Sequence, residues 1–148
     1  TSIDLKRMKH LNNIFKETLR LYPPVGFFAR EASKDTVMRK KEIKKGASII
    51  VAPWLTQRHE DYWDEPHHFK PDRFLEPEKI TKDTYFPFGM GERVCIGASF
   101  AMQESILILA SILRTYKLEL EPGFEPDIVG RLTIRSANGM NIVFSKRA

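Results

Sequence analysis

Apolar side chains near the start of the chain recur at spacings of three and four residues, the period of one face of a helix. These positions are Leu5, Met8, Leu11, Phe15, Leu19 and Tyr22. The pattern predicts an amphipathic helix over residues 4–21. The helix is expected to end before Pro23 and Pro24, because proline cannot continue it.

A second helical pattern covers residues 99–116 and follows a loop punctuated by glycines. Its most apolar part, residues 105–113, is too short to cross a bilayer, so we expect a buried core helix. The side chains expected on its inner side are Phe100, Leu107, Ile108 and Ala110. A shorter helix is predicted over residues 58–63, ahead of an irregular, proline-bounded segment that runs to residue 74.

Runs rich in β-branched and aromatic residues predict short strands between and after the helices. They cover residues 25–30, 36–38, 47–51, 117–120, 132–134 and 142–144, with a turn at Asn138 and Gly139. Together with the helices, they predict a mainly α chain with small antiparallel β-sheets, an α+β fold in the broad sense.

Composition agrees with a globular polypeptide: of 148 residues, 42% are hydrophobic and 29% are charged, enough for a modest core. The net charge of +5 includes a basic cluster at residues 39–41 and 44–45, which we interpret as a solvated hairpin tip. We therefore expect no nucleic-acid partner. A single cysteine fits a reducing compartment, and the chain opens with no secretory signal or membrane span, so we expect a cytoplasmic location.

The one cysteine, Cys95, directly precedes the second helix. Unpaired backbone N–H groups at a helix start favour negative charge and can hydrogen-bond a sulfur anion. Gly89, Gly91 and Gly97 permit tight turns and the close approach of a flat ligand, and Arg93 adds a cation suited to a carboxylate. A lone cysteine excludes an internal disulfide and a multi-cysteine metal site. What remains is an inert core thiol, a catalytic nucleophile or one axial ligand of a haem.

The loop also resembles a known family. Phe88, Gly91, Arg93, Cys95 and Gly97 match the fixed positions of the cysteine-loop signature of cytochrome P450. Two upstream motifs occur in the family's order: Glu-Thr-Leu-Arg at 17–20 resembles the Glu-x-x-Arg of the K helix, and Pro-Asp-Arg-Phe at 71–74 resembles the Pro-x-Arg-Phe of the following meander. The resemblance implies that residues 1–148 form the C-terminal part of a single P450 domain, without the N-terminal part that carries the oxygen-activating I helix.

The resemblance further implies a haem b site. Cys95 would be its catalytic thiolate and the axial ligand of the iron. Phe88, beside Gly89, would shield the sulfur, and the backbone N–H groups of Ile96 and Gly97 would hydrogen-bond it.

Two arginines, Arg93 and Arg30, are implied partners of the two haem propionates, since a guanidinium can grip a carboxylate through paired hydrogen bonds. Family members often have His-Arg-Asp where this chain has Gln57, Arg58 and His59. That departure argues against a propionate contact from Gln57.

The same resemblance implies a buried charge triad of Glu17, Arg20 and Arg73 that locks the first helix to the meander. Taken alone, Glu17 and Arg20 are one helical turn apart and equally fit a commonplace surface ion pair, which contributes about 0.2–0.5 kcal/mol. The triad's role would be structural.

A pocket for a small apolar substrate is the last implied site. The resemblance assigns to it Val25, Phe27, Phe28, Leu132 and Thr133, the last two at the tip of a hairpin. Phe27 and Phe28 equally fit ordinary core aromatics, and Leu132 and Thr133 equally fit packing between strands.

The implied reaction inserts one oxygen atom of O2 into an organic substrate. Electrons from NAD(P)H would arrive through an acidic redox partner such as a ferredoxin, flavodoxin or flavin reductase, with Arg114 and Lys117 as docking cations. Without the I helix, the chain alone is expected to be inactive. Two alternatives stay open: a haem-thiolate isomerase, peroxygenase or dehydratase, and a haem-binding module without turnover.

Overall fold

The computed structural model describes residues 7–131 and 133–147. In this part of the chain the α-helices are α2 (Lys9–Leu21), α3 (Pro53–Thr56) and α4 (Ala98–Thr115). The strands are β1 (Phe28–Glu31), β2 (Thr36–Met38), β3 (Lys41–Ile43), β4 (Ser48–Val51), β5 (Tyr116–Leu120), β6 (Ile128–Gly130), β7 (Ile134–Ser136) and β8 (Ile142–Lys146). The 3-10 helices η1 (Pro71–Phe74), η2 (Pro77–Lys79) and η3 (Gly91–Arg93) lie between α3 and α4.

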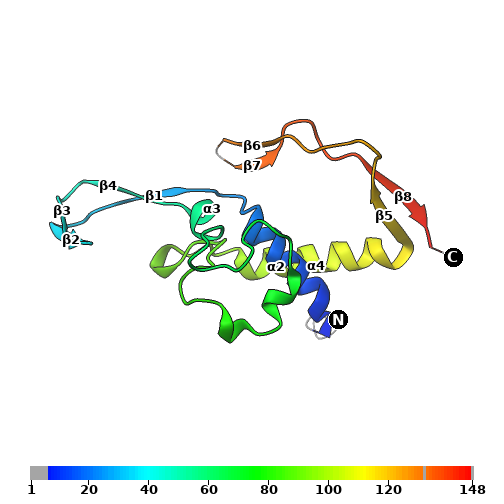
Figure 1. Cartoon of the computed structure of the whole chain (residues 1–148), viewed down its shortest axis with the longest axis horizontal. Helices are drawn as coiled ribbons and strands as arrows, with labels where there is room; N and C mark the ends of the chain where they lie inside the picture. The colour runs from blue at the N-terminus through cyan, green and yellow to red at the C-terminus, as the bar shows by residue number, and fades with distance from the viewer. Residues whose placement is uncertain (1–6, 132, 148) are drawn as a thin grey trace.

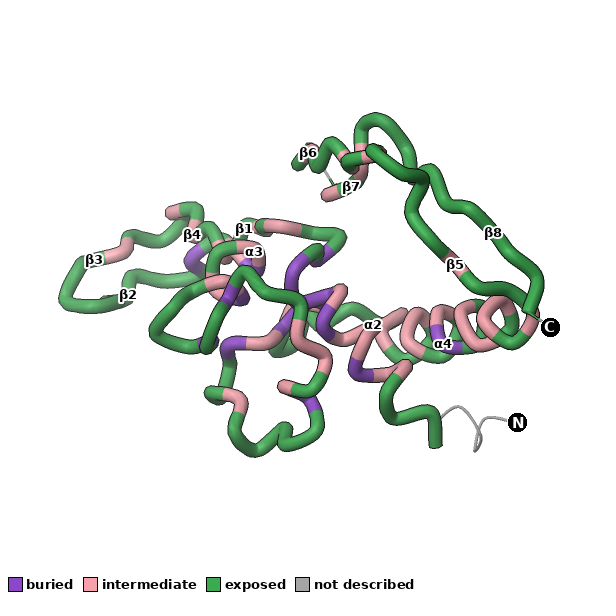
Figure 2. Tube along the Cα trace, turned by 45° about the vertical axis from the view of Figure 1, so that its right-hand side comes forward, coloured by how far each residue is buried: buried purple, intermediate pink, exposed green. Residues whose placement is uncertain are grey.

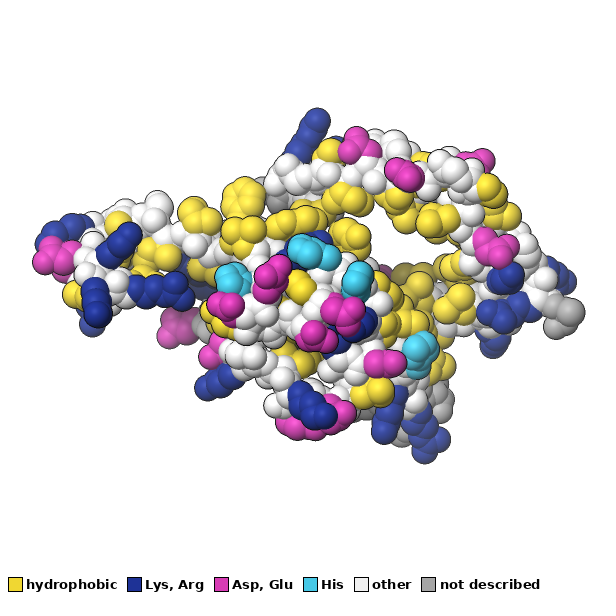
Figure 3. Space-filling model, viewed as in Figure 1, with side chains coloured by type: hydrophobic (Ala, Val, Ile, Leu, Met, Phe, Trp, Pro, Cys, Tyr) yellow, Lys and Arg dark blue, Asp and Glu magenta, His cyan; other side chains and the backbone are white. Residues whose placement is uncertain are grey.

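The described strands pair two at a time, and each pair is antiparallel. The pairs β1/β4 and β2/β3 extend to one end of the molecule, whereas β5/β8 and β6/β7 follow α4 (Figure 1). Arg39 and Lys40 form the tip of the β2/β3 hairpin with positive φ angles of 46° and 64°, as a two-residue hairpin turn requires. Lys and Arg side chains gather at this end, where the sequence predicted a basic hairpin tip (Figure 3).

Helix α2 is amphipathic and ends where the prolines predict. The backbone of Tyr22 has left the helical conformation at ψ 62°, while its N–H still donates to the carbonyl of Thr18 at 2.7 Å. Pro23 follows at once and is buried. Residues 4–6 of the predicted helix lie outside the described residues.

Buried residues concentrate where α2 meets the segments around α3 and η1 (Figure 2). The buried apolar side chains are Leu19, Leu21, Ala32, Trp63, Phe74, Phe86 and Ile106. Trp63, Phe74 and Tyr85 form an aromatic cluster with ring centroids 5.0 to 6.4 Å apart. The aromatic packing thus joins η1 to the irregular segments on both sides of it.

The predicted helix over residues 58–63 is wrong. The helix at this point is α3, which begins at Pro53, and residues 58–63 form turns in which Tyr62 and Trp63 both donate to the carbonyl of His59 at 3.0 Å. Tertiary contacts explain the difference. Arg58 donates from Nη2 to the carbonyl of Leu21 and places its guanidinium 5.6 Å from the centre of the Tyr22 ring, and Trp63 is buried in the core. The segment follows these distant contacts and not a local helical preference.

The small antiparallel sheets were predicted correctly, but the chain is a mixed α/β structure in which helices do not predominate. The strand predicted over residues 25–30 begins only at Phe28. Helix α4 has the predicted bounds to within one residue, yet Ile106 is its buried residue, and Phe100, Leu107 and Ile108 are more than half or half exposed. Among the described residues, no helix combines the length and apolar character needed to cross a membrane.

Candidate functional site

Cys95 lies in a loop that closes on itself through backbone hydrogen bonds. Its N–H donates to the carbonyl of Phe88 at 2.9 Å, and its own carbonyl accepts the N–H of Ala98, the first residue of α4, at 3.2 Å. Gly89 and Gly91 hold φ angles of +74° and +72°, which other residues rarely adopt. The loop therefore turns sharply and delivers an exposed free thiol just before a helix of 18 residues.

The thiol faces a cleft of about 360 Å³. One wall comes from the chain between α2 and the end of β1, and the other from the cysteine loop, with Pro53 of α3 between them in sequence. The lining residues are Pro24, Val25, Phe28, Arg30, Pro53, Pro87, Phe88, Gly89, Arg93 and Cys95. The structure thus brings together Cys95, both arginines and three aromatic or aliphatic side chains that the sequence singled out.

The two walls of the cleft approach each other closely at Gly89 and Phe28. A β-carbon built on Gly89 would lie 4.0 Å from Cζ of Phe28, on the opposite wall. The guanidinium of Arg30 lies 4.5 Å from the centre of the Phe28 ring and donates to the carbonyl of Ala29 at 3.0 Å. The Phe28 ring therefore supports Arg30 by a cation–π contact at the cleft edge.

Two residues of the predicted cofactor set do not line the cleft. The side chain of Ile96 is fully exposed, and Gly97 is the N-cap residue of α4. Gly97 still lies close to the sulfur, since a β-carbon built on it would be 3.8 Å from Sγ of Cys95. The prediction for both residues concerned their backbone N–H groups, and their position between Cys95 and α4 suits that use.

The residues predicted for a substrate pocket are divided between two cavities. Val25 and Phe28 line the cysteine cleft. Phe27, which directly precedes β1, lines a second cavity of about 500 Å³ formed with α3 and the β6/β7 hairpin. Its other lining residues are Gly26, Ile50, Ala52, Trp54, Leu55, Ile128, Gly130, Arg131 and Ile134. Thr133 is exposed in the β6/β7 connection beside this cavity, and Leu132 lies outside the described residues.

Glu17, Arg20 and Arg73 are in direct contact. Arg20 donates from Nε to Oε2 of Glu17 at 2.8 Å and from Nη2 to Oε1 at 2.9 Å, and Arg73 donates from Nε to Oε1 at 3.2 Å. Exposed fractions of the three side chains are 0%, 0% and 11%. The alternative of a surface ion pair between Glu17 and Arg20 is therefore excluded.

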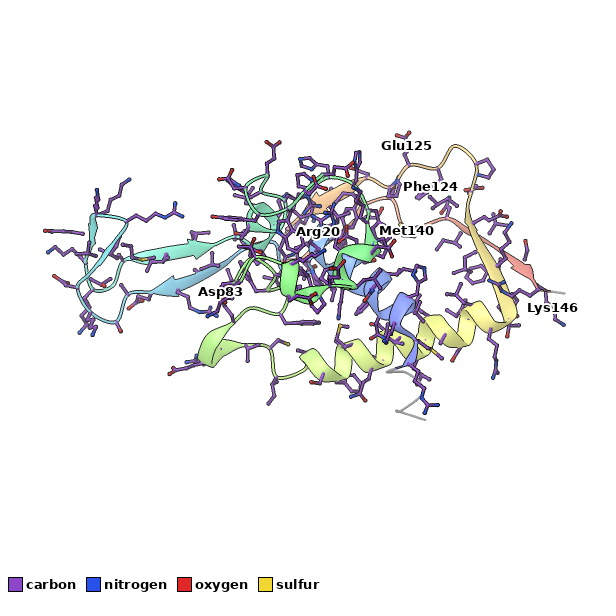
Figure 4. The ribbon with its side chains drawn as sticks, turned by 60° about the horizontal axis from the view of Figure 1, so that its bottom comes forward. Arg20, Asp83, Phe124, Glu125, Met140 and Lys146 are labelled. Carbon is purple, nitrogen blue, oxygen red and sulfur yellow. The ribbon has the colours of Figure 1, made fainter. Side chains whose placement is uncertain are left out.

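Arg20 continues this network into the loops around it, at the centre of the crowded side chains in Figure 4. Its Nη1 donates to the carbonyls of Gln57 at 2.7 Å and Pro66 at 2.8 Å, and Nη2 donates to the carbonyl of His68 at 3.1 Å. The guanidinium also lies 5.0 Å from the centre of the Trp63 ring. One buried cation thus binds three loop carbonyls, and the carbonyl of His68 also accepts Nη2 of Arg73 at 3.4 Å.

Sequence reasoning missed several residues of this region. The prolines Pro24, Pro53 and Pro87 line the cleft, and Gln57 is wholly buried between α2 and the cysteine loop. The sequence indicated that prolines end or begin elements, but it did not indicate that these prolines line the cleft. For Gln57 no local signal exists, because its burial depends on segments far away in the sequence.

With this geometry in place, comparison with known proteins identifies the family. The sequence model of cytochrome P450 matches residues 1–139, and the chain belongs to the cytochrome P450 family. Among relatives, it is 37% identical over 147 residues to cytochrome P450 4V2 of Rattus norvegicus, covering 97% of this chain and 28% of the relative. It is 36% identical over 146 residues to cytochrome P450 4d2 of Drosophila melanogaster, covering 98% of this chain and 29% of the relative.

A plant protein is similar to the same degree: cytochrome P450 CYP749A22 of Panax ginseng is 36% identical over 144 residues, 94% of this chain and 28% of that protein. The chain therefore spans somewhat more than a quarter of the length of these relatives. Membership of the family implies haem, and the cleft suits it: a free thiol, two arginines and an apolar lining match an iron, two carboxylates and a flat ring.

Proposed function

We propose that this chain supplies the thiolate side of the haem site in a monooxygenase that inserts one oxygen atom of O2 into an apolar organic substrate. The observation that carries the proposal is the cleft that Cys95, Arg30 and Arg93 line together with mostly apolar residues. Haem b, when bound, would supply the oxygen-activating iron, which a thiolate ligand makes electron-rich.

Each residue of the cleft has a distinct task. Cys95 lies at the end of a loop, and the hydrogen bond from its N–H to the Phe88 carbonyl closes this loop. Phe88 lines the same cleft, and its ring would shield the sulfur from water once haem is bound. The N–H groups of Ile96 and Gly97 would stabilise negative charge on the sulfur, because hydrogen bonds from the surroundings tune a metal ligand.

Arg93 and Arg30 come from opposite walls, so each can hold one propionate. Arg30 is already oriented by the Phe28 ring and by the carbonyl of Ala29, which lowers the entropy that a carboxylate contact would cost. The two arginines together would hold and orient a ring that carries two carboxylates.

Substrate contacts are proposed for Val25 and Phe28 in the cleft and for Phe27 in the second cavity, with Thr133 and Leu132 at the hairpin beside it. The second cavity supports an apolar substrate, since Arg131 is the one charged residue among those that line it in the described chain. An apolar molecule there would replace water against Trp54, Leu55 and Ile134.

Electron delivery from NAD(P)H is proposed to use an acidic protein partner, because exposed cations lie near the end of α4. Arg114 is exposed there, whereas Lys117 is paired with Glu119 at 2.7 Å and is the weaker candidate. Complementary charge mainly raises the association rate, and salt screens it over about 10 Å at 0.1 M.

Replacing the thiol tests the proposal. In the haem-loaded protein, Cys95→His should abolish the thiolate-type absorption of the reduced carbon-monoxide complex. Gln103→His, a change to the same residue at an exposed position of α4, should leave that absorption intact. A Cys95→His protein that retains the thiolate-type band would show that another group binds the iron.

A further inference from the structure

Gln57 is a wholly buried polar residue, with 0% of its surface exposed, and it has no part in the roles proposed above. Its Nε2 donates to the carbonyl of Leu19 at 3.1 Å and to that of Arg20 at 3.0 Å. Its Oε1 accepts the N–H of Phe86 at 2.9 Å. Both N–H bonds of the amide and one lone pair of its oxygen are therefore used between two distant segments.

These two segments lead into the two walls of the cysteine cleft. Leu19 and Arg20 form the last turn of α2, a few residues before the wall that holds Val25 to Arg30. Phe86 directly precedes Pro87, the first residue of the wall that holds Cys95. The Gln57 side chain is thus a direct hydrogen-bonded link between the bases of the two walls.

From Phe86, backbone hydrogen bonds lead on to the cysteine. The carbonyl of Phe86 accepts the N–H of Gly89 at 2.9 Å, and the carbonyl of Phe88 accepts the N–H of Cys95 at 2.9 Å. Side-chain packing contributes little to the loop itself, because Met90, Val94 and Ile96 are 42%, 52% and 103% exposed. The position of the loop therefore depends on how its base is held.

We propose that Gln57 is a positioning residue of the cysteine cleft, which sets the distance between its walls by holding the Phe86 N–H against the end of α2. Its effect on a bound haem rests on the proposed function, whereas its effect on the loop does not. The role requires the residue's chemistry and length. Leucine would leave two carbonyls and one N–H buried without partners. Asparagine, one methylene shorter, could not reach both segments.

Histidine is the informative replacement, since family members often have it at this position. One imidazole nitrogen can donate to an α2 carbonyl while the other accepts the Phe86 N–H. Gln57→His should therefore restore the link to Phe86 and lose one of the two bonds to α2.

Hydrogen exchange of the haem-loaded protein, read by mass spectrometry over residues 85–97, measures the loop directly. Gln57→Leu should speed exchange there by about tenfold or more, because the Phe86 N–H loses its partner together with the two α2 carbonyls. Exchange in α4 around the buried Ile106 should stay at the parent's rate. Gln57→His should lie near the parent, and Gln103→Leu, the same change at an exposed position, should match it.

The spectrum of the reduced carbon-monoxide complex gives a second readout. Gln57→Leu should lower the fraction of haem with the thiolate-type band, and Gln57→His should recover it. If Gln57→Leu does not fold, Gln57→Asn is the deciding variant. Faster hydrogen exchange at residues 85–97, with the exchange rate of α4 unchanged, supports the proposal. An exchange rate at 85–97 equal to the parent's overturns it.

Two results count against the positioning role. If residues 85–97 of Gln57→Leu exchange at the same rate as in Gln103→Leu, the link does not hold the loop. If exchange in α4 of Gln57→Leu rises equally, the variant has lost stability in general. Cys95→His separates the two proposals. If it keeps the thiolate-type band, the haem-thiolate function fails, while the exchange data still decide the role of Gln57.

Discussion

Removing the carboxylate of Glu17 should strongly destabilise the chain. Glu17 is wholly buried and accepts four hydrogen bonds: two from Arg20, one from the N–H of Lys70 at 2.8 Å and one from Arg73. In Glu17→Ala, the guanidinium of Arg20 stays buried without its counter-charge. Because its side chain is 0% exposed, water cannot replace the lost partner.

The size of the effect follows from this burial. Breaking a buried pair by removing one partner typically costs about 3–5 kcal/mol, because an uncompensated charge remains. Arg20 keeps its bonds to the carbonyls of Gln57, Pro66 and His68, which moderates the loss and places the expectation near the lower end of that range. Lys70 also loses the acceptor for its N–H, so the base of η1 should loosen.

Urea denaturation followed by far-ultraviolet circular dichroism measures the change. With a typical slope of about 1–3 kcal/mol per molar urea, Glu17→Ala should lower the midpoint by about 1 M or more. Glu104→Ala, at an exposed position of α4, is the matched control and should change stability by less than about 0.5 kcal/mol. Equal midpoints for the two variants would refute the reasoning that a desolvated charge network joins α2 to η1.

Three further outcomes are expected. Burial raises the pKa of Tyr85 in the folded chain above the ordinary value of 10.0 that it has in the unfolded chain. The unfolded chain therefore loses this proton first, and the free energy of unfolding falls as the pH rises above about 10. Tyr85→Phe should therefore flatten the fall in urea midpoint between about pH 9 and about pH 11, and an equal fall in both proteins would contradict this. Gly89→Ala should lower haem content and reduce the free energy of unfolding by about 1–2 kcal/mol, because Gly89 has a φ of +74°. Gly130→Ala is the control and should change neither quantity, since a β-carbon built on Gly130 meets no atom within 4 Å. In stopped-flow measurements, reduction by an acidic partner should slow with rising salt and slow further in Arg114→Glu but not in Lys40→Glu, and rates independent of salt would remove the docking surface.

Local pattern was enough to place much of the secondary structure. The apolar period before Pro23 predicted α2, the apolar stretch after Gly97 predicted α4, and the β-rich run before Pro53 contains β4. Each of these depends on residues near one another in sequence, where spacing and proline are direct physical constraints. The same holds for the cysteine loop, whose glycines at positive φ lie within a few residues of Cys95.

Local pattern failed where distant contacts decide the conformation. Residues 58–63 were predicted as a helix, but Arg58 contacts Leu21 and Tyr22 at the end of α2, and Trp63 packs beside Arg20 in the core. The backbone forms turns that allow these contacts. Three of the four residues predicted on the inner side of α4 are exposed, namely Phe100, Leu107 and Ile108, whereas Ala110 is half-buried and Ile106 is the buried residue. The buried face of a helix depends on the distant segments that pack against it.

The sequence by itself determined the chemistry available to this protein: one thiol in a glycine loop, arginines at positions 30 and 93, and charges spaced one turn apart in α2. Only the tertiary structure decided how these groups are used. It brings Arg30 and Arg93 to opposite walls of one cleft, sends Phe27 and Phe28 to different cavities and buries Gln57 between α2 and Phe86. The physical reason is that burial and distance between remote segments are set by packing of the whole chain, whereas residue type and local spacing are already present in the unfolded polypeptide.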